Sequence, residues 1–196
     1  RYAEPGESEE DFATRLADNL EKMILREGPE TVGAFIAEPV MGAGGVFPPP
    51  ATYFEKVQKV LAKYDVLFIV DEVVCGYGRT GQMFGSDTYG LKADILTTAK
   101  GLSSGYAPIS AVMVNEKVYG PVAANSGNIG VFGHGFTYSG HPVSCAIALE
   151  TLKIYEEEDV VGHARALATQ FQGSLRKYEG RKYVGEVRGV GLVGAI

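Results

Sequence analysis

Apolar residues recur every three to four positions in several stretches of this chain, and that period predicts amphipathic helices. The first stripe consists of Phe12, Leu16, Leu20, Met23 and Ile24. Ser8 and Asp11 at its start resemble a capping box, and Gly28 followed by Pro29 ends the helix. The same period predicts three further helices, at residues 54–64, 141–157 and 160–175.

Short apolar runs lie between these helices and predict buried strands. The runs are Val32–Ala37, Val66–Asp71, Ala93–Ala99, Ser110–Val114 and Gly191–Ile196. Glycine-rich loops at residues 75–90 and 127–140 separate some of them. This alternation predicts an α/β fold in which helices cover both faces of a mostly parallel sheet.

Composition argues against several classes of function. The net charge of −6, with no arginine-rich run, argues against a nucleic-acid partner. No apolar run approaches the roughly 18 residues of a membrane span, and no signal peptide opens the sequence. Cys75 and Cys145 lack the spacing of a metal site or a disulfide framework, which favours a reducing, cytoplasmic location. Gly42–Phe47 and the surroundings of Lys100 do not fit nucleotide-binding loops.

Asp71 and Lys100 bring chemistry to one predicted edge of the sheet. Asp71 closes one apolar run, and Lys100 directly follows another. Open α/β sheets bind ligands at the carboxyl ends of parallel strands, where these two side chains should meet. A lysine amine and a carboxylate are the groups that pyridoxal phosphate enzymes require. A solvated loop lysine is the alternative, and spacing by itself does not exclude it.

Four segments resemble the class III pyridoxal-phosphate aminotransferases, in particular the omega-amino acid:pyruvate or amine:pyruvate group. They are Ala37–Pro50 (AEPVMGAGGVFPPP), Leu67–Phe84 (LFIVDEVVCGYGRTGQMF), Ala93–Val112 (ADILTTAKGLSSGYAPISAV) and Phe132–Glu150 (FGHGFTYSGHPVSCAIALE). The resemblance implies part of the large domain of the fold-type I transferases. Residues 1–157 would belong to this cofactor-binding domain, and residues 158–196 would form a linking helix and the start of the small C-terminal domain.

Intact members of the family are more than twice as long as this chain, so we expect a fragment that is inactive or weakly active alone. The chain starts at Arg1 and stops at Ile196 inside an apolar run, which agrees with this expectation. The N-terminal phosphate loop, the aromatic residue on the pyridine ring and the C-terminal carboxylate-binding arginine of the family would all lie outside it.

The resemblance assigns the reactive amine to Lys100, which would form a Schiff base with pyridoxal phosphate and move a proton during catalysis. Burial and nearby positive charge should depress the pKa of this lysine. Asp71 would keep the pyridine nitrogen protonated. Val73 would pack on the ring face, and plain core packing describes the same position without a ligand.

Thr137 resembles the threonine that holds the cofactor phosphate of a neighbouring subunit, which implies a homodimer or a dimer of dimers. A threonine that caps its own turn is the alternative. Glu38 would lie on the substrate side of the cofactor, or would order the loop that follows it. Glu72 is expected to make a structural hydrogen bond or salt bridge. His134 is expected to bind no metal.

Ala43 narrows the substrate class. The ornithine and 4-aminobutyrate branches resemble EPIQGEAG, with a second glutamate where this chain has Ala43. Its absence favours transfer of an amino group from an omega-amino acid or amine to a keto acid such as pyruvate. Two hypotheses remain beside it. One is an aminomutase of the glutamate-1-semialdehyde type or a decarboxylating aminotransferase, and the other is an inactive fragment that acts only as a binding or oligomerisation module.

Overall fold

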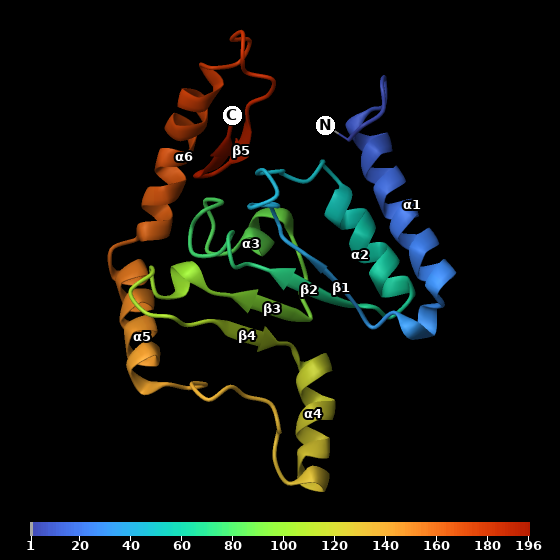
Figure 1. The fold of residues 1–196 in the computed structure, drawn as a ribbon, viewed down its shortest axis with the longest axis vertical. Helices are drawn as coiled ribbons and strands as arrows, with labels where there is room; N and C mark the ends of the chain where they lie inside the picture. The colour runs from blue at the N-terminus through green and yellow to red at the C-terminus, as the bar shows by residue number, and fades with distance from the viewer. Residues whose placement is uncertain (1) are drawn as a thin grey trace.

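A four-stranded sheet forms the centre of the protein (Figure 1), whose residues 2–196 are described by a computed structural model. Its strands are β1 (Ala34–Ala37), β2 (Leu67–Asp71), β3 (Ile95–Thr98) and β4 (Ala111–Val114). They lie side by side in chain order, β1, β2 and β3 parallel and β4 antiparallel to β3. The mostly parallel sheet predicted from the sequence is therefore confirmed.

Helices α1 (Glu9–Glu27) and α2 (Tyr53–Lys63) cover one face of this sheet (Figure 1). Ser8 begins α1 as predicted, because its Oγ accepts a hydrogen bond of 3.1 Å from the Asp11 N–H. The helix ends at Gly28, whose φ of 92° favours glycine. The core between helices and sheet consists of Leu20, Ile24, Phe54, Val57, Leu61, Val66, Phe68, Val70 and Leu91.

The opposite face of the sheet carries an apolar row that the described residues leave partly exposed. Ile36, Ile69, Ile95 and Val114 are register partners across the four strands. Ile36 is 60% exposed, Val114 is 44% exposed and Val112 on the same face is 66% exposed. Within residues 2–196, helices α1 and α2 therefore cover one face of the sheet, and the other face is partly exposed. Apolar runs indicate that both faces can be covered, but they do not say by which segment.

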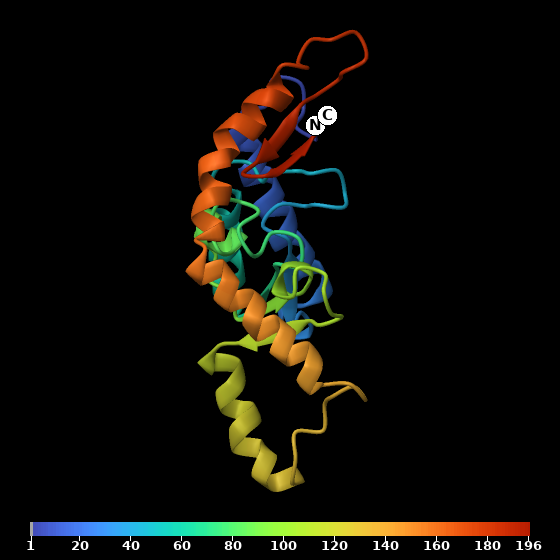
Figure 2. The ribbon, with the colours of Figure 1, turned by 90° about the vertical axis from the view of Figure 1, so that its left-hand side faces the viewer.

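Two helices were not predicted from the apolar pattern. The short α3 (Gly85–Tyr89) falls inside the first glycine-rich loop. The longer α4 (Glu116–Ile129) projects from one end of the sheet in both views (Figures 1 and 2). Asn115 caps α4 by accepting a hydrogen bond of 3.1 Å from the Val118 N–H. Helix α4 was not predicted because it contains Pro121 and because its apolar residues show only a weak helical period.

The C-terminal part runs along the side of the molecule to which β1, β2 and β3 point (Figures 1 and 2). It consists of α5 (Pro142–Glu157), α6 (Val160–Arg176) and a two-stranded hairpin of β5 (Arg188–Val190) and β6 (Val193–Ala195). Both helices and β6 were predicted, and β5 was not. The domain boundary between residues 157 and 158 stays a prediction. Within residues 2–196, no helix has both the length and the hydropathy to cross a bilayer.

Candidate active site

Three functional side chains predicted from the sequence lie at one edge of the sheet. Glu38 directly follows β1, Asp71 ends β2, and Lys100 comes two residues after β3. The register places Ala37 beside Val70 and Asp71 beside Thr97, so the three chain segments leave the sheet next to one another. This is the carboxyl edge of parallel strands, where ligands bind in open α/β sheets.

The Asp71 carboxylate is oriented by the turn that follows it. The Val73 N–H donates a hydrogen bond of 3.0 Å to Asp71 Oδ1. Both residues are half-buried, so the carboxylate is partly accessible and Val73 stands beside it. This local Asx-type contact fixes the direction of the side chain and leaves Oδ2 available to a ligand.

Glu72 points the opposite way from Asp71 and is fully buried. Its Oε2 accepts a hydrogen bond of 2.9 Å from the Gly85 N–H, and its Oε1 accepts two of 2.6 Å from the N–H and hydroxyl of Ser86. These donors belong to the first turn of α3. Burial raises the pKa of Glu72, and the hydrogen bonds from Ser86 and Gly85 counteract that effect. The expected structural hydrogen bond is confirmed.

Lys100 begins a single 3₁₀ turn, Lys100–Leu102, with a φ of 42°. That left-handed conformation is uncommon for a residue with a side chain, and such residues concentrate at functional sites. The side chain of Lys100 is exposed. The expected burial of this lysine is therefore wrong for residues 2–196, because the rest of the turn is buried but no described segment covers the Lys100 side chain.

The turn is held by two tyrosines that sequence reasoning missed. The Tyr155 hydroxyl on α5 donates a hydrogen bond of 2.6 Å to the Gly101 carbonyl, and it lies 2.6 Å from Ser104 Oγ. Tyr77 packs directly on Gly101, where an added Cβ would lie 2.7 Å from Tyr77 Cδ2. The rings of Tyr77 and Tyr155 are 5.9 Å apart. Tyr155 is 55 positions after Lys100 in the sequence, and no local sequence pattern predicts a contact between residues so far apart.

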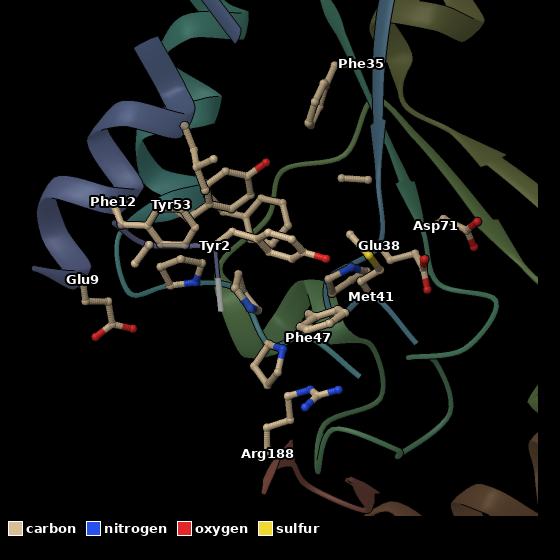
Figure 3. Close-up of a pocket in the computed structure, with 18 of the residues that line it drawn as sticks. Tyr2, Glu9, Phe12, Phe35, Glu38, Met41, Phe47, Tyr53, Asp71 and Arg188 are labelled. Carbon is tan, nitrogen blue, oxygen red and sulfur yellow. The ribbon is translucent and has the colours of Figure 1, made fainter. Parts of the chain in front are cut away.

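A cleft of about 970 Å³ opens beside the sheet edge and is lined by both Asp71 and Glu38 (Figure 3). Five aromatic residues also line it, from the segment before α1, from α1, β1 and α2, and from the loop between β1 and α2: Tyr2, Phe12, Phe35, Phe47 and Tyr53. Figure 3 shows the carboxylates of Asp71 and Glu38 on neighbouring strands, with Met41 and Phe47 close by. The cleft is therefore mainly apolar with a few acidic groups, as small-molecule sites commonly are.

Glu38 also orders the loop that follows it. Its Oε2 accepts a hydrogen bond of 2.9 Å from the Gly42 N–H. The two interpretations of Glu38, a substrate-side carboxylate and a loop-ordering carboxylate, are thus compatible with one position. Because one carboxylate oxygen is engaged by the loop, the other can face the cleft.

Thr137 lies away from this cleft, in an exposed turn between α4 and α5. A role toward a neighbouring subunit does not require proximity to Lys100 of the same chain, and it stays a prediction. No cluster of three potential metal ligands occurs in the part of the chain that the structure describes, His134 and its surroundings included. Cys75 is fully buried, and burial raises the pKa of its thiol to about 11, which makes a nucleophilic role unfavourable at neutral pH.

Known proteins have similar sequences over almost the whole of this chain. Residues 2–196 match the family described as aminotransferase class-III. The chain is 58% identical over 193 residues to the Solanum lycopersicum protein named gamma aminobutyrate transaminase 3, chloroplastic, with 98% of this chain and 37% of that protein aligned. It is also 58% identical over 191 residues to vanillin aminotransferase of Capsicum chinense, with 97% of this chain and 42% of that protein aligned.

A solved structure of similar sequence confirms the fold. The omega transaminase of Pseudomonas jessenii in complex with PMP has a TM-score of 0.97 at 56% identity, and the match covers 99% of this chain and 43% of that chain. The chain thus spans between 37% and 43% of the length of these three proteins.

Proposed function

We propose that this chain is part of a longer enzyme that transfers an amino group from an omega-amino acid or amine to a keto acid such as pyruvate. The proposal proceeds from the fact that the chain belongs to the class III aminotransferase family. The observation that carries the proposal is the placement of Lys100, Asp71 and Glu38 at neighbouring strand ends of one sheet edge.

Class III aminotransferases use pyridoxal phosphate, and the groups at this edge fit it. Lys100 presents an exposed primary amine, to which an aldehyde can bind covalently. The Asp71 carboxylate suits a protonated pyridine nitrogen, and Val73 beside it offers an apolar surface for a ring. When bound, the cofactor supplies an aromatic ring that withdraws electrons from the substrate carbon bearing the amino group.

Lys100 and Asp71 would have separate tasks in the transfer. Lys100 Nζ would accept a proton from the substrate carbon and donate it back at a second position. Asp71 would keep the pyridine nitrogen protonated, because a carboxylate nearby favours the cationic form. The turn fastened by Tyr155 would hold Nζ at the place where both proton movements occur.

The substrate class is inferred from the cleft and from Ala43. The aromatic lining suits an amine donor with an apolar body, and Glu38 is the acidic group closest in sequence to the loop that carries Ala43. Similar proteins are named gamma aminobutyrate transaminase, vanillin aminotransferase and omega transaminase, which supports an omega-amino acid or an amine as the donor.

We further infer a homodimer, in which Thr137 of one subunit reaches the cofactor phosphate of the other. The exposure of residues 131–140 leaves that loop accessible to a second copy. A cytoplasmic location stays a prediction. Two similar plant proteins are named chloroplastic and mitochondrial, so this inference from cysteine usage is open to a direct localisation experiment.

Alanine formation from pyruvate by the full-length protein tests the proposed reaction. We expect alanine with both an omega-amino acid donor and a neutral amine donor, and its loss in Lys100→Ala. Lys92→Ala is the matched control, because Lys92 is an exposed lysine outside the site. Alanine formation that persists in Lys100→Ala would contradict the assignment. Rearrangement of a substrate without consumption of pyruvate would favour the aminomutase hypothesis instead.

A further inference from the structure

Arg188, on the C-terminal hairpin, contacts the loop that follows Glu38. We call residues 38–47 the Glu38 loop. Arg188 Nε donates hydrogen bonds of 2.9 Å to the carbonyls of Gly45 and Val46, and Nη2 donates a second bond, of 2.5 Å, to Gly45. The guanidinium lies 4.5 Å from the centroid of the Phe47 ring. The side chain is 16% exposed, so these contacts are shielded from water.

The segment that Arg188 holds is strained. Val46 has a φ of 54°, in the left-handed region that a β-branched residue rarely adopts. Such a conformation is unfavourable and persists where surrounding contacts hold it in place. The two carbonyls bonded to Arg188 belong to Val46 and to the residue before it. Arg188 therefore stabilises the turn at its most unfavourable point.

Hydrogen bonds continue from this turn to Glu38. The N–H groups of Gly45 and Val46 donate to the Gly42 carbonyl at 3.1 and 3.0 Å. The Gly42 N–H donates in turn to Glu38 Oε2 at 2.9 Å. Met41 and Phe47 close the loop through a pair of backbone hydrogen bonds of 3.2 and 2.9 Å. An unbroken series of hydrogen bonds thus connects Arg188 with a carboxylate of the cleft.

The other end of this connection is also fixed. Gln172 Nε2 on α6 donates hydrogen bonds to the carbonyls of Gly191 and Val193 at 2.9 and 3.0 Å, which fastens the hairpin to the helix. Arg188 Nη1 forms an ion pair of 2.9 Å with Glu186, which also lines the cleft. Figure 3 shows Arg188 at the mouth of the cleft beside Phe47, with Glu38 further in.

We propose that Arg188 is a positioning residue for donor specificity: it couples the C-terminal hairpin to the Glu38 loop and so fixes Glu38 and Ala43 relative to the substrate. This inference rests on the proposed function, because it concerns the substrate side of the same site. Arginine suits the task better than lysine, since its planar fork reaches two carbonyls while it stacks on an aromatic ring.

The test compares Arg188→Gln and Arg188→Lys with Arg181→Gln in the full-length protein. Arg181 is the matched control, because it stacks on the Tyr178 ring at 4.9 Å but is exposed. For Arg188→Gln we expect a KM increase of about tenfold for an omega-amino acid donor, with kcat within about twofold. The increase should be smaller for a neutral amine, because a carboxylated donor is more sensitive to the position of Glu38. Arg188→Lys should be intermediate, and Arg181→Gln should match the wild type.

Hydrogen exchange supplies a readout that is independent of turnover. The Gly45 and Val46 amides should exchange at least about tenfold faster in Arg188→Gln than in the wild type, with or without cofactor. Unchanged exchange at these amides would overturn the proposal. An equal loss of kcat/KM for both donors, in step with a lower melting temperature, would reduce Arg188 to a structural residue and would also overturn it. If the wild type transfers no amino group, the proposed function fails, and exchange alone then decides the role of Arg188.

Discussion

The Tyr155 hydroxyl donates a hydrogen bond of 2.6 Å to the carbonyl of Gly101, the residue directly after Lys100. Because that hydroxyl proton is engaged, Ser104 Oγ donates to the Tyr155 oxygen, at 2.6 Å. One side chain of α5 thereby fastens both ends of the turn that presents Lys100. The backbone of Lys100 has an unfavourable left-handed φ, and the hydrogen bonds of Tyr155 help to stabilise the turn in this conformation.

Tyr155→Phe should lower stability by about 1–3 kcal/mol, because the ring is retained while two hydrogen bonds of about 0.5–1.5 kcal/mol each are lost. Urea unfolding measures this loss. Tyr183→Phe should have no measurable effect, since Tyr183 is 89% exposed. In the full-length protein, Tyr155→Phe should also change the rate at which an amine-reactive reagent modifies the Lys100 side chain. An unchanged rate would show that the hydroxyl does not position the amine.

Gly101→Ala should destabilise the protein more than the addition of a single methyl group usually does. The added Cβ would lie 2.7 and 2.8 Å from Cδ2 and Cβ of Tyr77, closer than real Cβ contacts allow. We expect a loss of about 1–3 kcal/mol, because overpacking a tight contact forces side chains or backbone to move. Gly33→Ala is the control, since an added Cβ there meets nothing within 4 Å. Equal melting temperatures for the two variants would contradict the contact.

Glu72 should make stability depend on pH with a definite sign. Burial raises its pKa in the folded protein above the unfolded value of 4.5. The folded state then binds the proton more tightly, so the contribution of Glu72 is fully present below pH 4.5 and is lost as pH rises through the folded pKa. Each unit of pKa elevation corresponds to about 1.4 kcal/mol. The stability difference between wild type and Glu72→Gln should therefore shrink as pH rises from about 4.5, measured by denaturant unfolding.

Glu7 provides a control of opposite sign for this pH dependence. The hydrogen bond from Arg15 lowers the pKa of Glu7 to about 2. Its contribution to stability is therefore present above pH 4.5 and is lost as pH falls toward about 2. A series in which Glu7→Gln and Glu72→Gln change the pH profile in the same direction would contradict both assignments.

The sequence predicted the elements that depend on local chemistry. Ser8 and Gly28 bound α1 as expected, because a cap and a helix stop are recognised within a few residues. Asp71 and Lys100 meet at one edge because parallel strands place their carboxyl ends together, a rule that needs no coordinates. The two residues whose roles the structure adds, Tyr155 and Arg188, act over 54 and more than 140 positions. Contacts between residues so far apart in the sequence depend on tertiary packing, which the apolar periodicity of a sequence does not predict.

Errors of sequence reasoning have equally physical causes. The role that the family resemblance implies for Lys100 led us to expect a buried lysine, but the burial of a side chain depends on which segments cover the edge of the sheet, and Lys100 is exposed in residues 2–196. The apolar pattern missed α4, because Pro121 and weak periodicity resemble a loop, although the Asn115 cap is a local signal that could have indicated a helix start.

Asp71→Asn separates charge from shape in the candidate site. The amide oxygen can still accept the hydrogen bond of the Val73 N–H, so stability should change little. The negative charge is lost, so transamination by the full-length protein should fall by about a hundredfold or more. Steady-state kinetics and thermal unfolding on the same sample measure both effects. Comparable activity in Asp71→Asn would remove Asp71 from the cofactor site.

The most direct test of the central claim is whether pyridoxal phosphate attaches to Lys100. The full-length protein and its Lys100→Ala and Lys92→Ala variants would be mixed with the cofactor, and absorbance recorded before and after borohydride. The account predicts a visible band in the wild type and in Lys92→Ala, a pyridoxyl group fixed on the Lys100 peptide after reduction, and neither in Lys100→Ala. A band that survives in Lys100→Ala, or a label on another lysine, would contradict it.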